Sequence, residues 1–174
     1  MPACKVCNSS ILSHLEKCII QIFNDVDLRQ SILTRQQREY IIRWLEVIDY
    51  KFQVINVRKK FQSGRGQAFV PYLADLPLSI MRTQFSPSQI ITQLRRSLHR
   101  ITRKDKSSNL NSLVFGNTKN PSFNFAHNMD EFVFIEMPTF NKFFFYFYNK
   151  KFLNTASAIR AADEVLKTRI YNTR

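Results

Sequence analysis

The sequence predicts an α+β protein that is mostly helical, and three observations lead to that prediction. Apolar residues recur at spacings of three and four in several segments, which is the periodicity of amphipathic helices. Two aromatic, β-branched runs near the C-terminus are separated by a short proline-containing stretch, which is typical of a β-hairpin. Of the 174 residues, 44% are hydrophobic and sixteen are phenylalanine, so the chain can bury a substantial core.

The first helix is expected to follow Ser9 or Ser10, because either serine can cap it. Its apolar residues form one stripe, made of Ile11, Leu15, Ile19, Ile22 and Phe23.

A long central helix is expected from about Arg35 to Lys60. It begins at Thr34-Arg-Gln-Gln37, which has the form of a capping box. Its apolar residues recur at alternating spacings of four and three, at Ile41, Leu45, Ile48, Phe52 and Ile55. The glycines Gly64 and Gly66 are expected to end it.

A basic amphipathic helix is expected from Pro87 to about Arg103. Ser86 can cap it, and proline is favoured at the first helical position. The predicted buried stripe consists of Ile90, Ile91, Leu94, Leu98 and Ile101, and most of the remaining surface is basic.

The C-terminal part is expected to form an aromatic β-hairpin followed by a helix. Residues 105–120 are rich in Ser, Asn and Lys and predict an exposed connector. Strands are predicted at 131–137 and 142–148, with the turn between them at 138–141. The last helix is expected over 155–171, with Ile159, Ala162, Val165 and Leu166 pointing inward.

The aromatic strand and the following Ala156-Ser-Ala-Ile159 are similar to the third strand and second helix of the RNA-recognition motif. That family has small residues where Phe143 and Phe145 stand in this chain. We therefore expect these aromatic side chains to belong to the core and not to a base-stacking surface.

The charge balance indicates a polyanionic partner. Twenty-six Lys and Arg oppose thirteen Asp and Glu, which gives a net charge of +13 and a pI near 10. Nucleic acid, either DNA or RNA, is the first candidate, because phosphate contacts by basic side chains release counterions. An anionic membrane surface, an acidic protein or a packaged genome would fit the same charge. The predicted phosphate contacts are Arg58, Lys59, Lys60, Arg65, Arg95, Arg96, Arg100, Arg103, Lys104 and Lys106.

All three cysteines lie in the first eighteen residues together with a histidine. Cys4 and Cys7 can share one ion from a turn, and His14 and Cys18, four residues apart, lie on one face of the first helix. These residue types predict a structural Zn²⁺ site, because four protein ligands leave no position for an activated water. The alternative is that Cys18 is a small buried hydrophobe and His14 an ordinary surface histidine.

The pattern Cys-x2-Cys-x6-His-x3-Cys resembles the short Cys-Cys-His-Cys zinc fingers. These include knuckles that bind single-stranded nucleic acid and fingers that bind ubiquitin. The six residues between Cys7 and His14 are intermediate between the two spacings. The resemblance therefore implies zinc but does not choose a partner.

Three segments are expected: a zinc-finger-like segment at 1–24, a helical basic region at 25–106, and a hairpin with a helix at 120–174 that forms one globular unit with the second. The odd number of closely spaced cysteines favours a reducing compartment, nuclear or cytoplasmic. We expect no secretory signal and no membrane span, because the aromatic run at 143–148 is far too short.

The motifs of catalysis are not recognised in the sequence, so we expect a protein that is not an enzyme. The leading hypothesis is a zinc-stabilised, basic nucleic-acid-binding protein that contacts mainly the phosphate backbone. The alternative is a structural or assembly protein, for example a viral component, that uses the finger and its aromatic surface for protein contacts or self-association.

Overall fold

The computed structural model describes residues 12–25, 33–64, 87–103, 105–128 and 131–171. Contacts group the chain into two compact units. The helical unit comprises Met1–His14 and Glu46–Arg103, and the sheet unit comprises Leu15–Leu45 and Lys104–Arg174. This division differs from the three predicted segments, because one long helix contributes residues to both units. The α+β, mostly helical class is confirmed.

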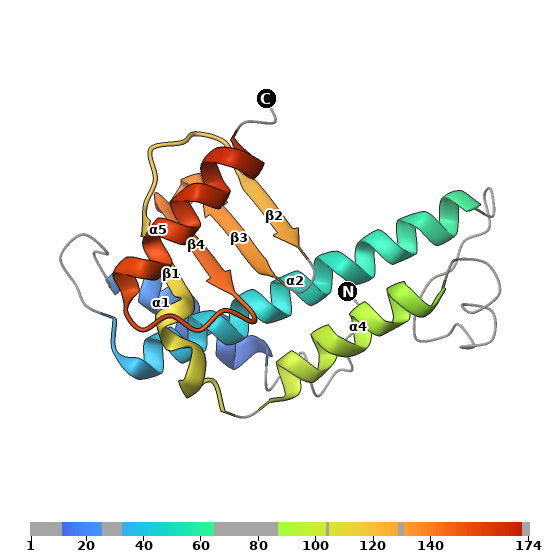
Figure 1. Ribbon diagram of the computed structural model, residues 1–174, viewed down its shortest axis with the longest axis horizontal. Helices are drawn as coiled ribbons and strands as arrows, with labels where there is room; N and C mark the ends of the chain where they lie inside the picture. The colour runs from blue at the N-terminus through green and yellow to red at the C-terminus, as the bar shows by residue number, and fades with distance from the viewer. Residues whose placement is uncertain (1–11, 26–32, 65–86, 104, 129–130, 172–174) are drawn as a thin grey trace. The chain divides into compact units, whose positions relative to one another are not determined.

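The sheet unit contains a four-stranded antiparallel sheet with the strand order β1-β4-β3-β2 (Figure 1). The strands are β1 (Leu113–Asn117), β2 (Asn124–Asn128), β3 (Phe132–Met137) and β4 (Lys142–Phe147). The predicted hairpin is β3 and β4, joined through the short helix η4 (Pro138–Phe140) and Asn141. Asn141 has a φ of 52°, in the left-handed region that asparagine tolerates better than most residues.

The predicted connector at 105–120 is wrong. Its residues form the 3-10 helix η3 (Ser107–Ser112) and then strand β1, which pairs with β4. Gly116 of β1 lies opposite Phe143, and a Cβ there would come within 2.8 Å of the Phe143 ring. The absence of a side chain at Gly116 therefore lets the Phe143 ring lie across the strand.

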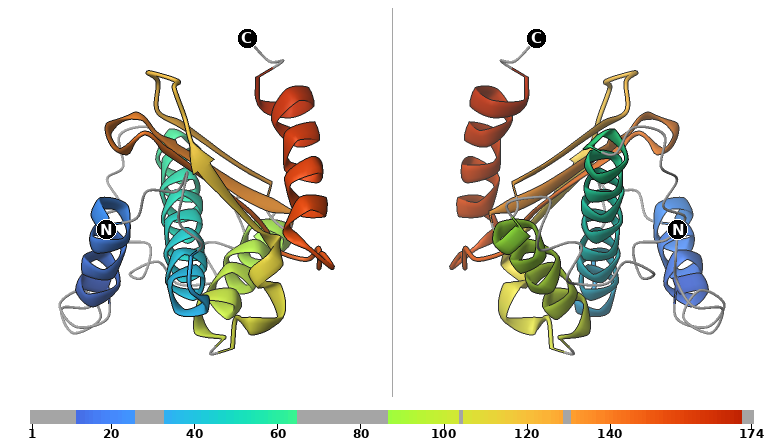
Figure 2. Two further views of the ribbon diagram at one scale, coloured as in Figure 1. Left: turned by 90° about the vertical axis from the view of Figure 1, so that its left-hand side faces the viewer. Right: turned by 90° about the vertical axis from the view of Figure 1, so that its right-hand side faces the viewer.

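One face of the sheet is covered by α5 (Thr155–Val165), which continues as the π-helical turn η5 (Leu166–Ile170) (Figure 2). Alternate strand residues point to this face, as the two-residue period of a strand requires. The core on this face consists of Val114, Phe132, Phe134, Phe145 and Phe147 from the sheet and Ala158, Ala162 and Val165 from α5. The small alanines let the helix approach the aromatic rings closely.

The opposite face is covered by α1 (Ser13–Asp25) and by the first turns of α2 (Arg35–Gly64) (Figure 2). The Phe23 ring stacks on Phe144 with ring centroids 5.2 Å apart, and the Trp44 and Phe144 rings form a T-shaped contact with centroids 6.3 Å apart. With both faces covered, Phe144 and Phe145 are 0% exposed. The prediction that the strand aromatics form core is confirmed.

Local signals placed the two N-terminal helices correctly. On α1, Leu15, Ile19, Ile22 and Phe23 are all buried, as the stripe predicted. The capping box of α2 is present: the Gln37 amide donates to Thr34 Oγ1 at 3.2 Å, and the Thr34 amide donates to Gln37 Oε1 at 2.8 Å. Ile11 lies outside the part of the chain that is described.

Two apolar residues expected inside are on the surface. Leu98 is 48% exposed and Ile159 is 43% exposed. On each helix the neighbouring small residue faces inward instead, since Ser97 is 1% and Ala158 is 0% exposed. Adjacent residues point about 100° apart on a helix, so the choice between them depends on what packs against the helix.

Glu136 on β3 is the centre of a buried polar cluster. It is 2% exposed, and its carboxylate accepts hydrogen bonds from Asn120 Nδ2 at 2.8 Å, Asn124 Nδ2 at 2.6 Å and Tyr171 Oη at 3.2 Å. Thr118 Oγ1 donates to the other oxygen. These neutral donors compensate the buried charge and attach residues 118–124 and the end of the C-terminal helix to the sheet.

Replacing Glu136 with glutamine is therefore expected to lower the free energy of unfolding by about 3 kcal/mol, because an amide would face the amide donors of Asn120 and Asn124. The measurement is urea denaturation followed by far-UV circular dichroism. Glu131→Gln is the matched control, because the pair of Glu131 with Arg169, at 2.6 Å, is partly exposed. Its loss should cost less than about 1 kcal/mol. Equal losses for the two variants would contradict the assigned role of Glu136.

Candidate nucleic-acid interface on helix α4

The helical unit places α4 (Pro87–Thr102) beside the later turns of α2 (Figure 1). The two helices run antiparallel. Their polar contacts follow that direction, since Asp49 lies opposite Arg100 and Gln53, one turn further along α2, lies opposite Ser97. The start and end of α4 agree with the predicted helix from Pro87 to about Arg103.

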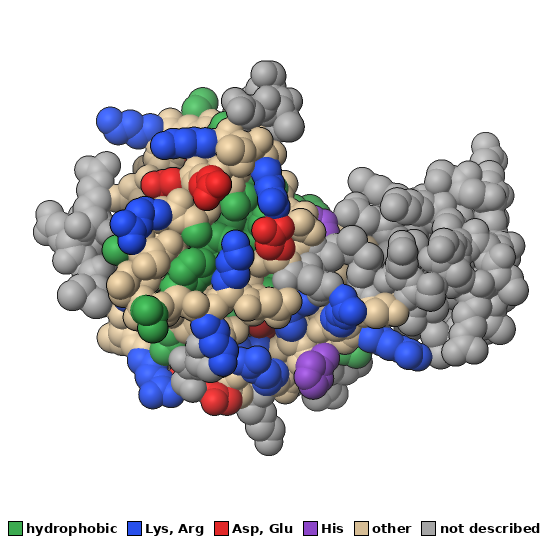
Figure 3. Space-filling view, in the orientation of Figure 1, with side chains coloured by type: hydrophobic (Ala, Val, Ile, Leu, Met, Phe, Trp, Pro, Cys, Tyr) green, Lys and Arg blue, Asp and Glu red, His purple; other side chains and the backbone are tan. Residues whose placement is uncertain are grey.

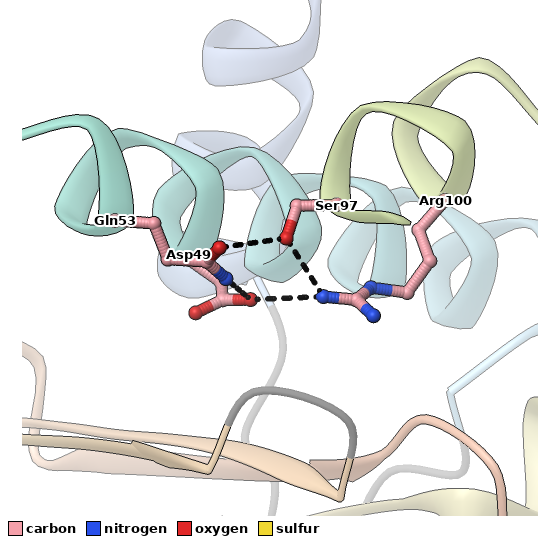
Figure 4. Close-up of polar contacts among 4 residues, drawn as sticks. All are labelled: Asp49, Gln53, Ser97 and Arg100. Carbon is pink, nitrogen blue, oxygen red and sulfur yellow. Dashed lines mark hydrogen bonds and ion pairs between the residues drawn. The ribbon is translucent and has the colours of Figure 1, made fainter. Parts of the chain in front are cut away.

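Four side chains close a ring of polar contacts between the helices (Figure 4). On α2, Gln53 Nε2 donates to Asp49 Oδ2 at 2.8 Å. Across the helices, Ser97 Oγ donates to Gln53 Oε1 at 2.9 Å. Arg100 Nη2 then donates to Ser97 Oγ at 2.9 Å and lies 3.5 Å from Asp49 Oδ2, which completes the ring.

This ring is withdrawn from solvent. Asp49 and Ser97 are each 1% exposed, Gln53 is 5% exposed, and the side chain of Arg100 is 16% exposed. A buried carboxylate costs several kcal/mol unless a counter-charge and hydrogen bonds compensate it. Arg100 supplies the counter-charge, and Gln53 supplies a hydrogen bond. The ring therefore determines which side of α4 faces α2.

The opposite side of α4 is basic and exposed. Arg95, Arg96, His99 and Arg103 are all exposed. At 3.6 residues per turn their positions fall within an arc of about 100° on the helix. The sequence of α4 contains no Asp or Glu, so the helix itself places no carboxylate among these arginines. We call this surface, which consists of Arg95, Arg96 and Arg103 with His99, the arginine face.

The other basic residues predicted to contact phosphate have different positions. Arg58, Lys59 and Lys60 belong to α2, but their side chains are outside the described part of the structure, as are Arg65 and Lys104.

The prediction that Lys106 contacts phosphate is wrong, because this residue is 1% exposed. Its carbonyl accepts a hydrogen bond from the Asn109 amide at 3.2 Å, at the start of η3. Phosphate cannot reach a side chain buried in this way. Arg100 is also not on the arginine face.

Basic side chains of the C-terminal helix are mixed with acidic ones. On α5, Asp163 and Glu164 are exposed between Arg160 and Lys167. Figure 3 shows the same mixture of acidic and basic side chains on the face it presents. A surface of mixed sign attracts a polyanion less than a surface of one sign. Compared with the C-terminal helix, α4 therefore carries the better candidate surface.

The predicted zinc ligands are only partly within the described residues. Cys4 and Cys7 are outside them, while His14 is exposed and Cys18 half-buried on α1. Across the described ranges, no three His, Cys, Asp or Glu side chains form a group able to hold a metal ion. The zinc site remains a prediction.

A cavity of about 250 Å³ in the sheet unit borders Cys18. It is lined by Cys18, Gln21, Ile22, Gln36, Gln37 and Tyr40. None of these side chains is a carboxylate, an imidazole or an amine. The cavity therefore offers amide and hydroxyl hydrogen bonds but no charged group.

Asp49, Gln53 and Ser97 are not among the site residues predicted from the sequence. A signal was present, because Ser97 lies three residues after Leu94 and four before Ile101, in the middle of the predicted buried stripe. Likewise Asp49 follows the buried Leu45 by four residues, and Gln53 follows Asp49 by four. Polar residues at core positions of two helices predict a polar contact between them.

Comparison with known proteins found no matching family model, no matching curated protein and no matching solved structure. Among the helices that the structure describes, none is long and apolar enough to cross a membrane.

Replacing Arg100 with alanine is expected to lower the free energy of unfolding by about 3–5 kcal/mol, because the Asp49 carboxylate would remain buried and lose the positive charge that Arg100 places 3.5 Å from it. Arg95→Ala, on the exposed side of the same helix, should change it by less than about 0.5 kcal/mol. Urea denaturation of both variants measures the difference. A loss for Arg100→Ala no larger than that for Arg95→Ala would show that the ring does not stabilise the helical unit.

Proposed function

We propose that this protein binds nucleic acid, DNA or RNA, mainly through the phosphate backbone, and that it is not an enzyme. The observation that carries the proposal is the arginine face: three arginines exposed on one side of a helix whose other side is held by the buried ring. The net charge of +13 adds a general attraction to polyanions.

The arginine face suits phosphate in spacing and in chemistry. Arg96 and Arg103 are seven residues apart, or about 10 Å along the helix axis, so they can reach different phosphates of one strand. Guanidinium groups form paired hydrogen bonds with phosphate oxygens. Contacts of this kind position a protein on the backbone and carry no direct sequence information.

Replacing Arg95, Arg96 and Arg103 together with glutamine should weaken binding to a fluorescently labelled duplex. Each lost phosphate contact should also reduce the slope of log affinity against log salt by about 0.9 for DNA. Fluorescence anisotropy over a series of salt concentrations measures both quantities.

The control removes the same amount of charge from another surface, as Lys151→Gln, Arg160→Gln and Lys167→Gln, all exposed residues. It should reduce affinity less and leave the salt slope nearly unchanged. If wild-type protein does not bind DNA or RNA at low salt, or binds without salt dependence, the proposed function is wrong.

We also propose that one structural Zn²⁺ orders the N-terminal segment through Cys4, Cys7, His14 and Cys18. The donor types fit zinc, and His14 and Cys18 lie four residues apart on α1, as two ligands on one helical face require. The ion would contribute folding energy to this segment and, with four protein ligands, no catalytic water.

Elemental analysis of protein purified without chelator should find one zinc per chain. Cys7→Ala and His14→Ala should each lose it, because three ligands hold a structural ion poorly. His99→Ala is the matched control on α4 and should retain the metal. Retention of zinc by Cys7→Ala and His14→Ala would place the ion elsewhere, and metal-free wild-type protein would exclude the site.

A second candidate function is protein assembly, by self-association or with another protein. It is favoured by exposed apolar side chains of the sheet unit, among them Leu153 at 97% and Phe123 at 56% exposure. Light scattering coupled to size exclusion, without nucleic acid, distinguishes the two. An assembly protein should form oligomers without nucleic acid. A nucleic-acid-binding protein of the proposed type does not need to oligomerise in order to bind.

A further inference from the structure

Arg100 differs from the other arginines of α4. Arg95, Arg96 and Arg103 are exposed, whereas the side chain of Arg100 is 16% exposed and turns toward Asp49 on the neighbouring helix (Figure 4). Its Nη2 atom is shared between Ser97 Oγ at 2.9 Å and Asp49 Oδ2 at 3.5 Å. The spacing of arginines in the sequence does not reveal this difference.

We infer that Asp49 withholds the Arg100 guanidinium from polyanions, so that Arg100 is a positioning residue of α4 and not a phosphate contact. Asp49 acts in this way as a competitor for phosphate within the chain. The choice of ligand rests on the proposed function, but the sequestered state of Arg100 does not.

Arg100 stays paired with Asp49 because Asp49 is buried, whereas a phosphate bound at the surface is in contact with solvent. To contact phosphate, Arg100 would have to leave a carboxylate that is 1% exposed. That carboxylate would lose the charge of Arg100 at a place where little water can replace it. An ion pair with a phosphate in solvent is screened and contributes less. The equilibrium therefore keeps Arg100 on Asp49.

Neutralising Asp49 should have the opposite effect on Arg100 and make its guanidinium available to polyanions. Asp49→Asn keeps the size of the side chain and can still accept a hydrogen bond from Gln53, but it removes the negative charge 3.5 Å from the Arg100 guanidinium. The guanidinium can then turn outward and add one cation to the arginine face. Loss of a carboxylate at this position should therefore strengthen binding, although the carboxylate is not on the exposed surface.

The first test measures the accessibility of each arginine without nucleic acid. The folded protein is treated briefly with phenylglyoxal, which modifies accessible guanidinium groups, and each peptide is quantified by mass spectrometry. Arg95 should react at least several times faster than Arg100 in the wild type, and Asp49→Asn should bring the two rates close together. Equal rates in the wild type would overturn the inference.

The second test measures salt dependence of binding to a labelled DNA duplex and to immobilised heparin. Arg95→Gln should reduce the salt slope on duplex by about 0.9, Arg100→Gln should leave it unchanged, and Asp49→Asn should increase it by about 0.9. The double variant Asp49→Asn with Arg100→Gln should return to the wild-type slope. If the ring had only a structural role, the Asp49→Asn variant would not show an increased salt slope that the second substitution abolishes.

Folding of each variant is checked by circular dichroism before binding is measured. If a single variant does not fold, the double variant, which removes both charges together and keeps the net charge, is compared with wild type. A reduced slope in the double variant would overturn the inference. If the wild type binds neither duplex nor heparin, the proposed function fails, and phenylglyoxal reactivity alone decides the state of Arg100.

Discussion

The need to compensate one buried carboxylate determines what helix α4 presents to solvent. Asp49 is almost fully withdrawn from water and faces α4, so that helix must bring a cation to it, and Arg100 is the residue that does so. Ser97 and Gln53 complete the contact with neutral hydrogen bonds. Because a helix is rigid, directing position 100 inward places Arg95, Arg96 and Arg103 on the outer side.

The sheet unit also contains a buried carboxylate, but its charge is compensated by neutral hydrogen-bond donors. Glu136 is as deeply buried as Asp49, but the hydrogen bonds it receives come from amide and hydroxyl groups of Thr118, Asn120, Asn124 and Tyr171. Neutral donors stabilise the anion and hold a loop in place without using a basic residue. The charge of Asp49 is instead compensated by Arg100, which is one of the cations on which polyanion binding would depend. A formal count of arginines on α4 therefore overestimates the number available to a ligand.

The elements predicted correctly are those defined by neighbouring residues. The capping box at Thr34, the proline at position 87 and the three-four spacing of α1 and α2 act over a few residues, so the sequence shows them directly. The β3–β4 hairpin is similar, because a short turn connects two strongly apolar strands. Strand β1 was missed because it has five residues and contains a glycine, and because its partner β4 lies about thirty residues further along the chain.

By itself the sequence determined the α+β class, the basic character of α4 and the set of arginines that could serve a polyanion, since composition and local periodicity settle these properties. Only the tertiary structure decided which of those side chains remain in solvent. Arg100 pairs with Asp49, Lys106 is buried, and Leu98 is exposed while its neighbour Ser97 faces inward. Each outcome depends on the free energy of burying a charge or a small polar group against a distant part of the chain, and no local pattern contains that term.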